Sequence, residues 1–189
     1  MKEIFGLIAV FISIVGIIPY FLDTIHKKIR PHFISWLIWS IVTIIAFLAQ
    51  WVKGGGAGSW STGITGLIAI VITLFAFKNG TRNITGLDKV LFLGSLFAIF
   101  VWVFIKEPLL SIFVVIIIDA SACYYTIKKA IEEPKSEKPI LFYANIIKTI
   151  LAIIALQQYN LVTVIYPVYQ LISNSALIAS IKMKHIMKR

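Results

Sequence analysis

Seven apolar runs follow one another along the chain, and short polar segments separate them. A helix needs about 20 residues to cross a hydrocarbon core of roughly 30 Å, and each run has about that length. Lipid cannot satisfy open backbone groups, and the ten-residue alternating strands of a membrane barrel do not occur here. The pattern predicts seven transmembrane helices. Their spans are Ile4–Leu22, Phe33–Val52, Trp60–Phe77, Lys89–Ile105, Pro108–Ile127, Pro139–Leu156 and Leu161–Ile181.

Composition supports an all-α integral membrane protein. Of 189 residues, 59% are hydrophobic and only 14% are charged. That leaves too little polar surface to coat a water-soluble globule. Because the segments between the runs are short, residues 1–189 are expected to form a single membrane domain.

The net charge is +10, and the positions of the basic residues along the chain predict its orientation in the membrane. The segments after spans one, three, five and seven hold fourteen of the eighteen lysines and arginines, whereas the N-terminus and the segments after spans two, four and six hold three. The positive-inside rule then places the N-terminus outside and the C-terminus in the cytoplasm. The expected partners are anionic lipid headgroups at the basic cytoplasmic loops, and nucleic acid is not expected.

Two similar segments, about a hundred residues apart, each follow directly after an apolar run. Thr24–Lys28 follows the first run and Thr126–Lys129 the fifth, and a proline opens the next run each time. This favours an internal repeat, although apolar helices with basic ends also resemble one another by chance. The division is a three-helix unit at 1–78, a linker helix at 79–106, and a second three-helix unit with a cytoplasmic tail at 107–189. A single linker helix inverts the chain once, so the two units are expected to be parallel.

The glycine-rich segment at 54–58 lies between the second and third spans. It lacks the Lys-Ser/Thr that follows a phosphate-binding loop. A tight turn is the expected structure, and a hinge for an outer gate is the alternative.

Two charged residues lie inside the predicted spans. Asp119 is eight residues from the cytoplasmic end of its span, about 12 Å deep, and Lys148 is nine residues from its own, roughly 13 to 14 Å deep. Their matching depth suggests a pair that faces the bundle interior. It is either a structural ion pair or a site for proton or cation coupling, unless the two residues never meet.

Other polar and aromatic residues lie at shared depths. Trp39, Asn145 and Asn174 share a depth of about 10 Å on the cytoplasmic half. They either line a cavity between the units, with the ring and amides binding a small polar solute, or join helices by hydrogen bonds. Four more candidates for substrate binding lie closer to the outer side. They are Thr62, Thr65, Tyr169 and Gln170.

Two prolines and two further aromatic residues also lie inside the predicted spans. Pro19 and Pro167 lie within the first and last spans, where they act as gating hinges or as packing features. Tyr20 and Trp36 fall near inner ends of spans and are expected in the interfacial aromatic belt.

Enzyme chemistry is not expected. His26, His32 and His185 all fall in basic segments, and the HExxH, CxxC and GxSxG motifs are absent. No metal or cofactor site follows from the sequence.

Three motifs near the first two spans resemble the SWEET, PQ-loop and PnuC superfamily of small-solute transporters. They are Pro19-Tyr20, with tyrosine in place of the glutamine of the Pro-Gln pattern, the basic stretch at 27–31, and the Ser-Trp-Leu-Ile-Trp-Ser run at 35–40. The chain also resembles a group of uncharacterised bacterial membrane proteins.

The resemblance implies a substrate site between two three-helix units that open alternately. Sugar-transporting members use Trp and Asn side chains, which correspond here to Trp39 and Asn174. Asp119 looks like the acidic residue of proton-coupled members. The function expected is a bacterial inner-membrane facilitator or proton-coupled transporter for a small polar metabolite such as a sugar, an amino acid or a vitamin precursor. The alternative is a non-transporting interaction, lipid-binding or sensory module, and the oligomeric state is left open, a homo-oligomer included.

Overall fold

Helices account for almost all of the described chain. The computed structural model describes residues 1–28, 30–81, 83–132 and 139–187. Within these ranges lie seven α-helices and two short helices of other types. They are α1 (Lys2–Ile25), α2 (Phe33–Val52), the 3₁₀ helix η1 (Gly56–Ser59), α3 (Trp60–Asn79), α4 (Gly86–Phe100), the π-helix η2 (Val101–Ile105), α5 (Pro108–Glu132), α6 (Pro139–Ala155) and α7 (Leu161–Met187).

Each predicted span coincides largely with one α-helix, and the bounds of α2 agree with the prediction at both ends. The fourth span continues from α4 into η2, and the sixth ends one residue past α6. Four helices run past the predicted ends at Leu22, Phe77, Ile127 and Ile181. No proline or glycine interrupts the backbone there, so the hydrogen bonding continues after the apolar run stops.

The helix α4 starts earlier than predicted because of its cap. The Thr85 hydroxyl accepts a hydrogen bond from the backbone N–H of Asp88 at 3.2 Å. In return, the Asp88 carboxylate accepts one from the Thr85 backbone N–H at 2.8 Å. This capping box fixes the first turn of α4 at Gly86.

The outer surface of the bundle is apolar. Five helices, namely α1, α2, α3 together with η1, α4 together with η2, and α7, are long and apolar enough to cross a membrane. Large side chains such as Phe11, Leu74, Phe104 and Ile172 are more than 60% exposed on these helices. A soluble protein rarely exposes so many. The protein is therefore a multi-pass membrane protein.

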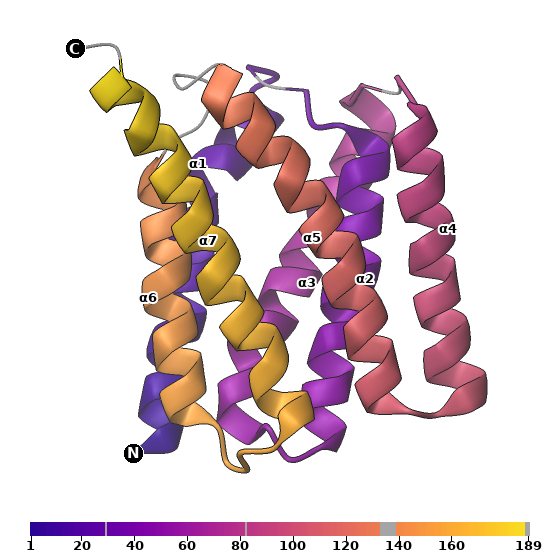
Figure 1. Cartoon of the computed structure of the whole chain (residues 1–189), viewed down its shortest axis with the longest axis vertical. Helices are drawn as coiled ribbons and strands as arrows, with labels where there is room; N and C mark the ends of the chain where they lie inside the picture. Colours follow the sequence, from indigo (N-terminus) through magenta and orange to yellow (C-terminus); the bar gives the residue numbers. More distant parts are fainter. Residues whose placement is uncertain (29, 82, 133–138, 188–189) are drawn as a thin grey trace.

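Six helices pack side by side around the bundle, in the order α1, α3, α2, α5, α7 and α6, and α6 packs against α1 again. The remaining helix, α4, lies to one side and contacts α2 and α5 (Figure 1). The two termini lie at opposite ends of the bundle (Figure 1), as an odd number of crossings requires.

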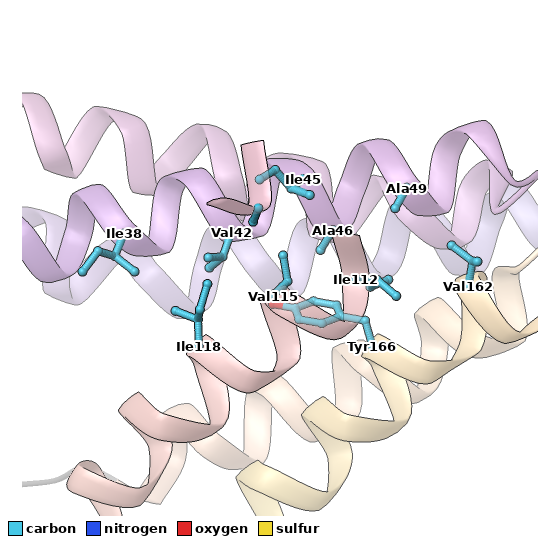
Figure 2. Packing of buried hydrophobic residues seen from close by; sticks show 11 residues of the cluster. Ile38, Val42, Ile45, Ala46, Ala49, Ile112, Val115, Ile118, Val162 and Tyr166 are labelled. Carbon is cyan, nitrogen blue, oxygen red and sulfur yellow. The ribbon is translucent and has the colours of Figure 1, made fainter. Parts of the chain in front are cut away.

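The main apolar core joins α2 to α5 and α7. Val42, Ile112 and Val115 are fully or almost fully buried in it, and Tyr166 adds the face of its ring (Figure 2). Small residues on α2, Ala46 among them, let the three helices approach closely. This core holds one side of the bundle together.

The connection between α2 and α3 is bonded to the connection between α6 and α7. Three hydrogen bonds join them: Gln157 N–H to Gly55 O at 3.2 Å, Gln158 N–H to Gly54 O at 3.0 Å, and Asn160 Nδ2 to Lys53 O at 2.8 Å. The predicted tight turn is confirmed, because Gly54 and Gly56 have φ angles of +81° and +52°. Such angles favour glycine.

Candidate functional site

A central cavity of about 430 Å³ lies inside the bundle. Its lining comes from six helices, namely α1, α2, α3, α5, α6 and α7. Polar and aromatic side chains from all six converge there, as expected of a small-molecule site. The size is sufficient for a small metabolite.

The structure brings most of the predicted site residues to this cavity. All seven side chains predicted to bind substrate line it, together with both charged residues and one proline. They are Trp39, Thr62, Thr65, Asn145, Tyr169, Gln170 and Asn174, then Asp119, Lys148 and Pro167. The other predicted hinge, Pro19, is on the exposed outer face of α1 and is not part of the lining.

Asp119 is held by a network on α7. The Gln170 amide Nε2 donates to Asp119 Oδ2 at 2.9 Å and to the Tyr166 hydroxyl at 3.0 Å. Asn174 Nδ2 in turn donates to the Gln170 backbone carbonyl at 2.7 Å. All these partners are neutral, so the network orients the carboxylate without neutralising its charge.

Lys148 has a separate neutral partner. Its Nζ donates to Thr65 Oγ1 at 3.1 Å, across the bundle from α6 to α3. The Thr65 hydroxyl donates its own proton to the Ser61 backbone carbonyl at 2.7 Å. The hydroxyl is therefore an acceptor for the ammonium, which has two further N–H donors directed elsewhere.

The two charges do not form an ion pair with each other. Among the described residues, the ion pairs are Lys28 with Asp23 at 3.7 Å and His32 with Asp88 at 3.9 Å, both outside the cavity. A charged side chain at the centre of a membrane helix costs roughly 2.5 to 3.5 kcal/mol on insertion scales. Asp119 and Lys148 bear this cost while they face one cavity unpaired.

Two aromatic residues assigned from the sequence to the interfacial belt line the cavity instead. The Trp36 indole Nε1 donates to the Tyr20 hydroxyl at 3.0 Å, and the same indole packs edge-on against Trp39 with 5.3 Å between ring centroids. A residue of the interfacial belt and a residue of the cavity can lie at the same membrane depth, and they differ in whether the side chain points to the lipid or into the bundle. The three-residue spacing of Trp36 and Trp39, which places them on one helix face, was the available signal.

One buried hydroxyl at the cavity has no partner. Tyr169 lines the cavity, and its hydroxyl lacks a hydrogen-bond partner in the described part of the chain. A buried polar group without a partner costs about 1 to 3 kcal/mol, and native structures contain few of them. The Tyr169 hydroxyl on α7 can thus form a hydrogen bond with a ligand in the cavity.

A second hollow of about 330 Å³ lies between the α1–α2 and α3–α4 connections. Three cations, Lys27, Arg30 and Lys78, line it together with neutral residues. Backbone hydrogen bonds between 31–33 and Thr81 fasten its two walls to each other. No acidic side chain of the described residues is paired with these three cations.

The described residues contain no group of three or more His, Cys, Asp or Glu side chains placed to hold a metal ion. The lining of the central cavity offers a solute charged groups, hydrogen-bonding groups and aromatic surfaces. Comparison of the chain with protein-family models, with curated proteins and with solved structures found no match.

Proposed function

We propose that this protein is an inner-membrane transporter, a facilitator or a proton-coupled carrier, for a small polar metabolite. The observation that carries the proposal is the central cavity, in which two charges and several amides and hydroxyls line one space within a lipid-exposed bundle. Polar side chains at membrane depth are expensive, and they usually mark a substrate or ion path.

The packing order of the helices supports two parallel units, 1–78 and 107–189, joined by α4 within the linker at 79–106. Exchanging α1, α2 and α3 for α5, α6 and α7 maps each helix contact onto another observed contact. Thus α1–α3 corresponds to α5–α7, α2–α3 to α6–α7, α1–α6 to α2–α5, and α3–α6 to α2–α7. The contacts of α4 with its η2 extension, and those of η1, have no counterpart under this two-fold relation.

Alternating access between these units agrees with the hydrogen bonding at one end of the bundle. The three hydrogen bonds between the α2–α3 and α6–α7 connections join one unit to the other. Each contributes about 0.5 to 1.5 kcal/mol, so the whole set is small enough to break and re-form during a cycle. We assign these connections and the N-terminus to the outside, and the basic end with the C-terminus to the cytoplasm, by the positive-inside rule.

Anionic headgroups are the proposed partners at the cytoplasmic end. The basic hollow between the α1–α2 and α3–α4 connections holds three cations without a paired acid, and a lipid phosphate would neutralise them.

Uptake into vesicles tests the transport proposal. Purified protein in liposomes is offered a panel of labelled sugars, amino acids and vitamin precursors, with and without a pH gradient. We expect one chemical class to accumulate above protein-free vesicles. If a pH gradient drives that uptake, Asp119→Asn is expected to abolish the pH dependence, whereas Asp23→Asn, which alters an exposed ion pair outside the cavity, is expected to retain it. The absence of uptake across the panel would favour a non-transporting module.

A further inference from the structure

The central cavity contains one positive and one negative side chain that are not paired with each other. Asp119 on α5 is bonded to Gln170, and Lys148 on α6 is bonded to Thr65. Both charged groups face the same space. A structural ion pair would have joined them directly, since attraction grows as charges approach in a low-dielectric interior.

Both charged groups have hydrogen-bonding capacity left for a ligand. In the described residues, the Asp119 carboxylate accepts one bond, at Oδ2, although a carboxylate has about four acceptor sites. The Lys148 ammonium donates one bond, to Thr65, and has three N–H groups. A solute that brings a cation to the first and an anion to the second would satisfy both.

We propose that the transported solute is a zwitterion that spans these two groups. Its anionic group binds Lys148, and its cationic group binds Asp119, whose carboxylate Gln170 holds in place. The aromatic lining, with Trp39 and Tyr169 among it, contacts the carbon skeleton between the charges. This inference rests on the proposed transport function and names its substrate class.

The cavity would then select by charge at two separate points. A neutral sugar would leave both charges unsatisfied, and a simple carboxylate or amine would satisfy only one. Because Asp119 and Lys148 are fixed on different helices, the separation of the two charges in the solute should also matter.

Binding to the full-length protein in detergent tests this directly, without any transport. The probes are glycine, β-alanine, 4-aminobutyrate, 5-aminovalerate and 6-aminohexanoate, compared with matched carboxylates, matched alkylamines and neutral polyols by thermal shift. We expect an optimum at one chain length. At that length, the zwitterion is expected to bind about 10- to 100-fold more tightly than either singly charged analogue.

Variants assign each charge of the probe to its partner. Lys148→Met is expected to reduce zwitterion affinity to that of the alkylamine, and Asp119→Asn to that of the carboxylate. Thr65→Val and Thr65→Ser form a milder pair that keeps both charges. The valine variant should weaken binding several-fold because the ammonium loses its hydroxyl acceptor, whereas the serine variant should bind like the wild type.

Two outcomes would overturn the inference. One is polyol binding as tight as that of every zwitterion, and the other is unchanged zwitterion affinity in both Lys148→Met and Asp119→Asn. The transport proposal fails separately. Tight zwitterion binding without uptake into vesicles would remove the transport function and keep the site. Uptake of a neutral solute together with either outcome above would keep the transport function and remove the zwitterion site.

Discussion

At one end of the bundle, the connections α2–α3 and α6–α7 are bonded to each other, and η1 is buried between them and the helices. At the other end, the connections α1–α2 and α3–α4 surround a hollow lined by three cations. We call the first the latched end, because hydrogen bonds within the chain join the two three-helix units there. The second, the basic end, carries charge that its own described acids do not balance.

Under the proposed function, the latched end is the one that opens and the basic end is the one that is anchored. Opening the latched end breaks three hydrogen bonds and exposes small, closely packed residues, and all of these contacts can form again. The basic end is suited to hold position against charged headgroups. The proposed transport function would need both, namely one end that opens and one surface that stays at the membrane interface.

The largest effect is expected from filling the closest approach at the latched end. A Cβ on Gly58 would lie 2.6 Å from the Ala152 carbonyl oxygen and 2.7 Å from the Leu156 backbone nitrogen. Gly58→Ala should therefore destabilise the protein by about 3 kcal/mol, because backbone atoms have to move. The thermal unfolding midpoint in detergent measures it.

Gly86 supplies the matched control. A Cβ at this position on the first turn of α4 would meet no atom within 4 Å. Gly86→Ala should leave stability unchanged or raise it by less than about 1 kcal/mol. Equal unfolding midpoints for the two variants would show that the latched end is loosely packed.

The second prediction concerns an amide without a partner at the same end. Gln50 on α2 is 0% exposed, and neither its side-chain nitrogen nor its side-chain oxygen has a hydrogen-bond partner in the described chain. Gln50→Leu should stabilise the closed end by about 1 to 2 kcal/mol, since the desolvation cost of the amide disappears. The unfolding midpoint should rise and solute uptake should slow.

An exposed amide in the neighbouring connection is the control for this change. Gln158 is exposed; its backbone N–H donates the hydrogen bond to Gly54, and its side chain lies over Gly54 without a hydrogen bond among the described residues. Gln158→Ala should change neither the midpoint nor the uptake. A lower midpoint for Gln50→Leu would mean that the amide forms hydrogen bonds in the predominant state.

These features differ in how far the sequence could predict them. The helix α2 was predicted at both ends because the length of an apolar run and the residues that flank it are local properties. The depth of Asp119 and Lys148 was also local, and both reach the cavity. Their partners, Gln170 and Thr65, were not predicted, because depth along a helix says nothing about rotation around its axis.

Packing between distant segments escaped sequence reasoning for the same reason. The lack of a partner for Gln50 and the bonding of the two connections depend on how segments a hundred residues apart approach one another. The internal repeat suggested that the halves meet, but its second motif at 126–129 concerns side chains that lie largely outside the described set.

The third prediction loosens the latch without removing a helix cap. Asn160 Nδ2 donates to the Lys53 carbonyl at 2.8 Å, while its Oδ1 accepts from the Thr163 N–H and caps α7 at 3.1 Å. Asn160→Asp keeps the cap and loses the donor, so the latch should weaken by about 1 kcal/mol.

The single cysteine reports the result. Cys123 lines the central cavity, and it is the only cysteine in the sequence. With a membrane-impermeant thiol reagent applied from the side of the latched end, labelling of Cys123 should be about fivefold faster in Asn160→Asp than in the wild type. Unchanged labelling from that side would mean that this hydrogen bond does not keep the end closed.

The smallest effect is expected at the basic end, where charges act through solvent. Lys78→Ala removes one of three cations from the hollow, and each basic residue near an anionic surface contributes about 1 kcal/mol or less. Phosphatidylglycerol should raise the unfolding midpoint of the wild type more than that of this variant, and salt should reduce the difference. Lys53→Ala, at the latched end, should respond to the lipid like the wild type.

If inorganic phosphate reproduces the whole effect, the hollow binds a free anion instead of a headgroup. If neither phosphate source separates Lys78→Ala from Lys53→Ala, the two ends do not differ in anion binding, and the basic end loses its proposed role as the anchored side of the bundle.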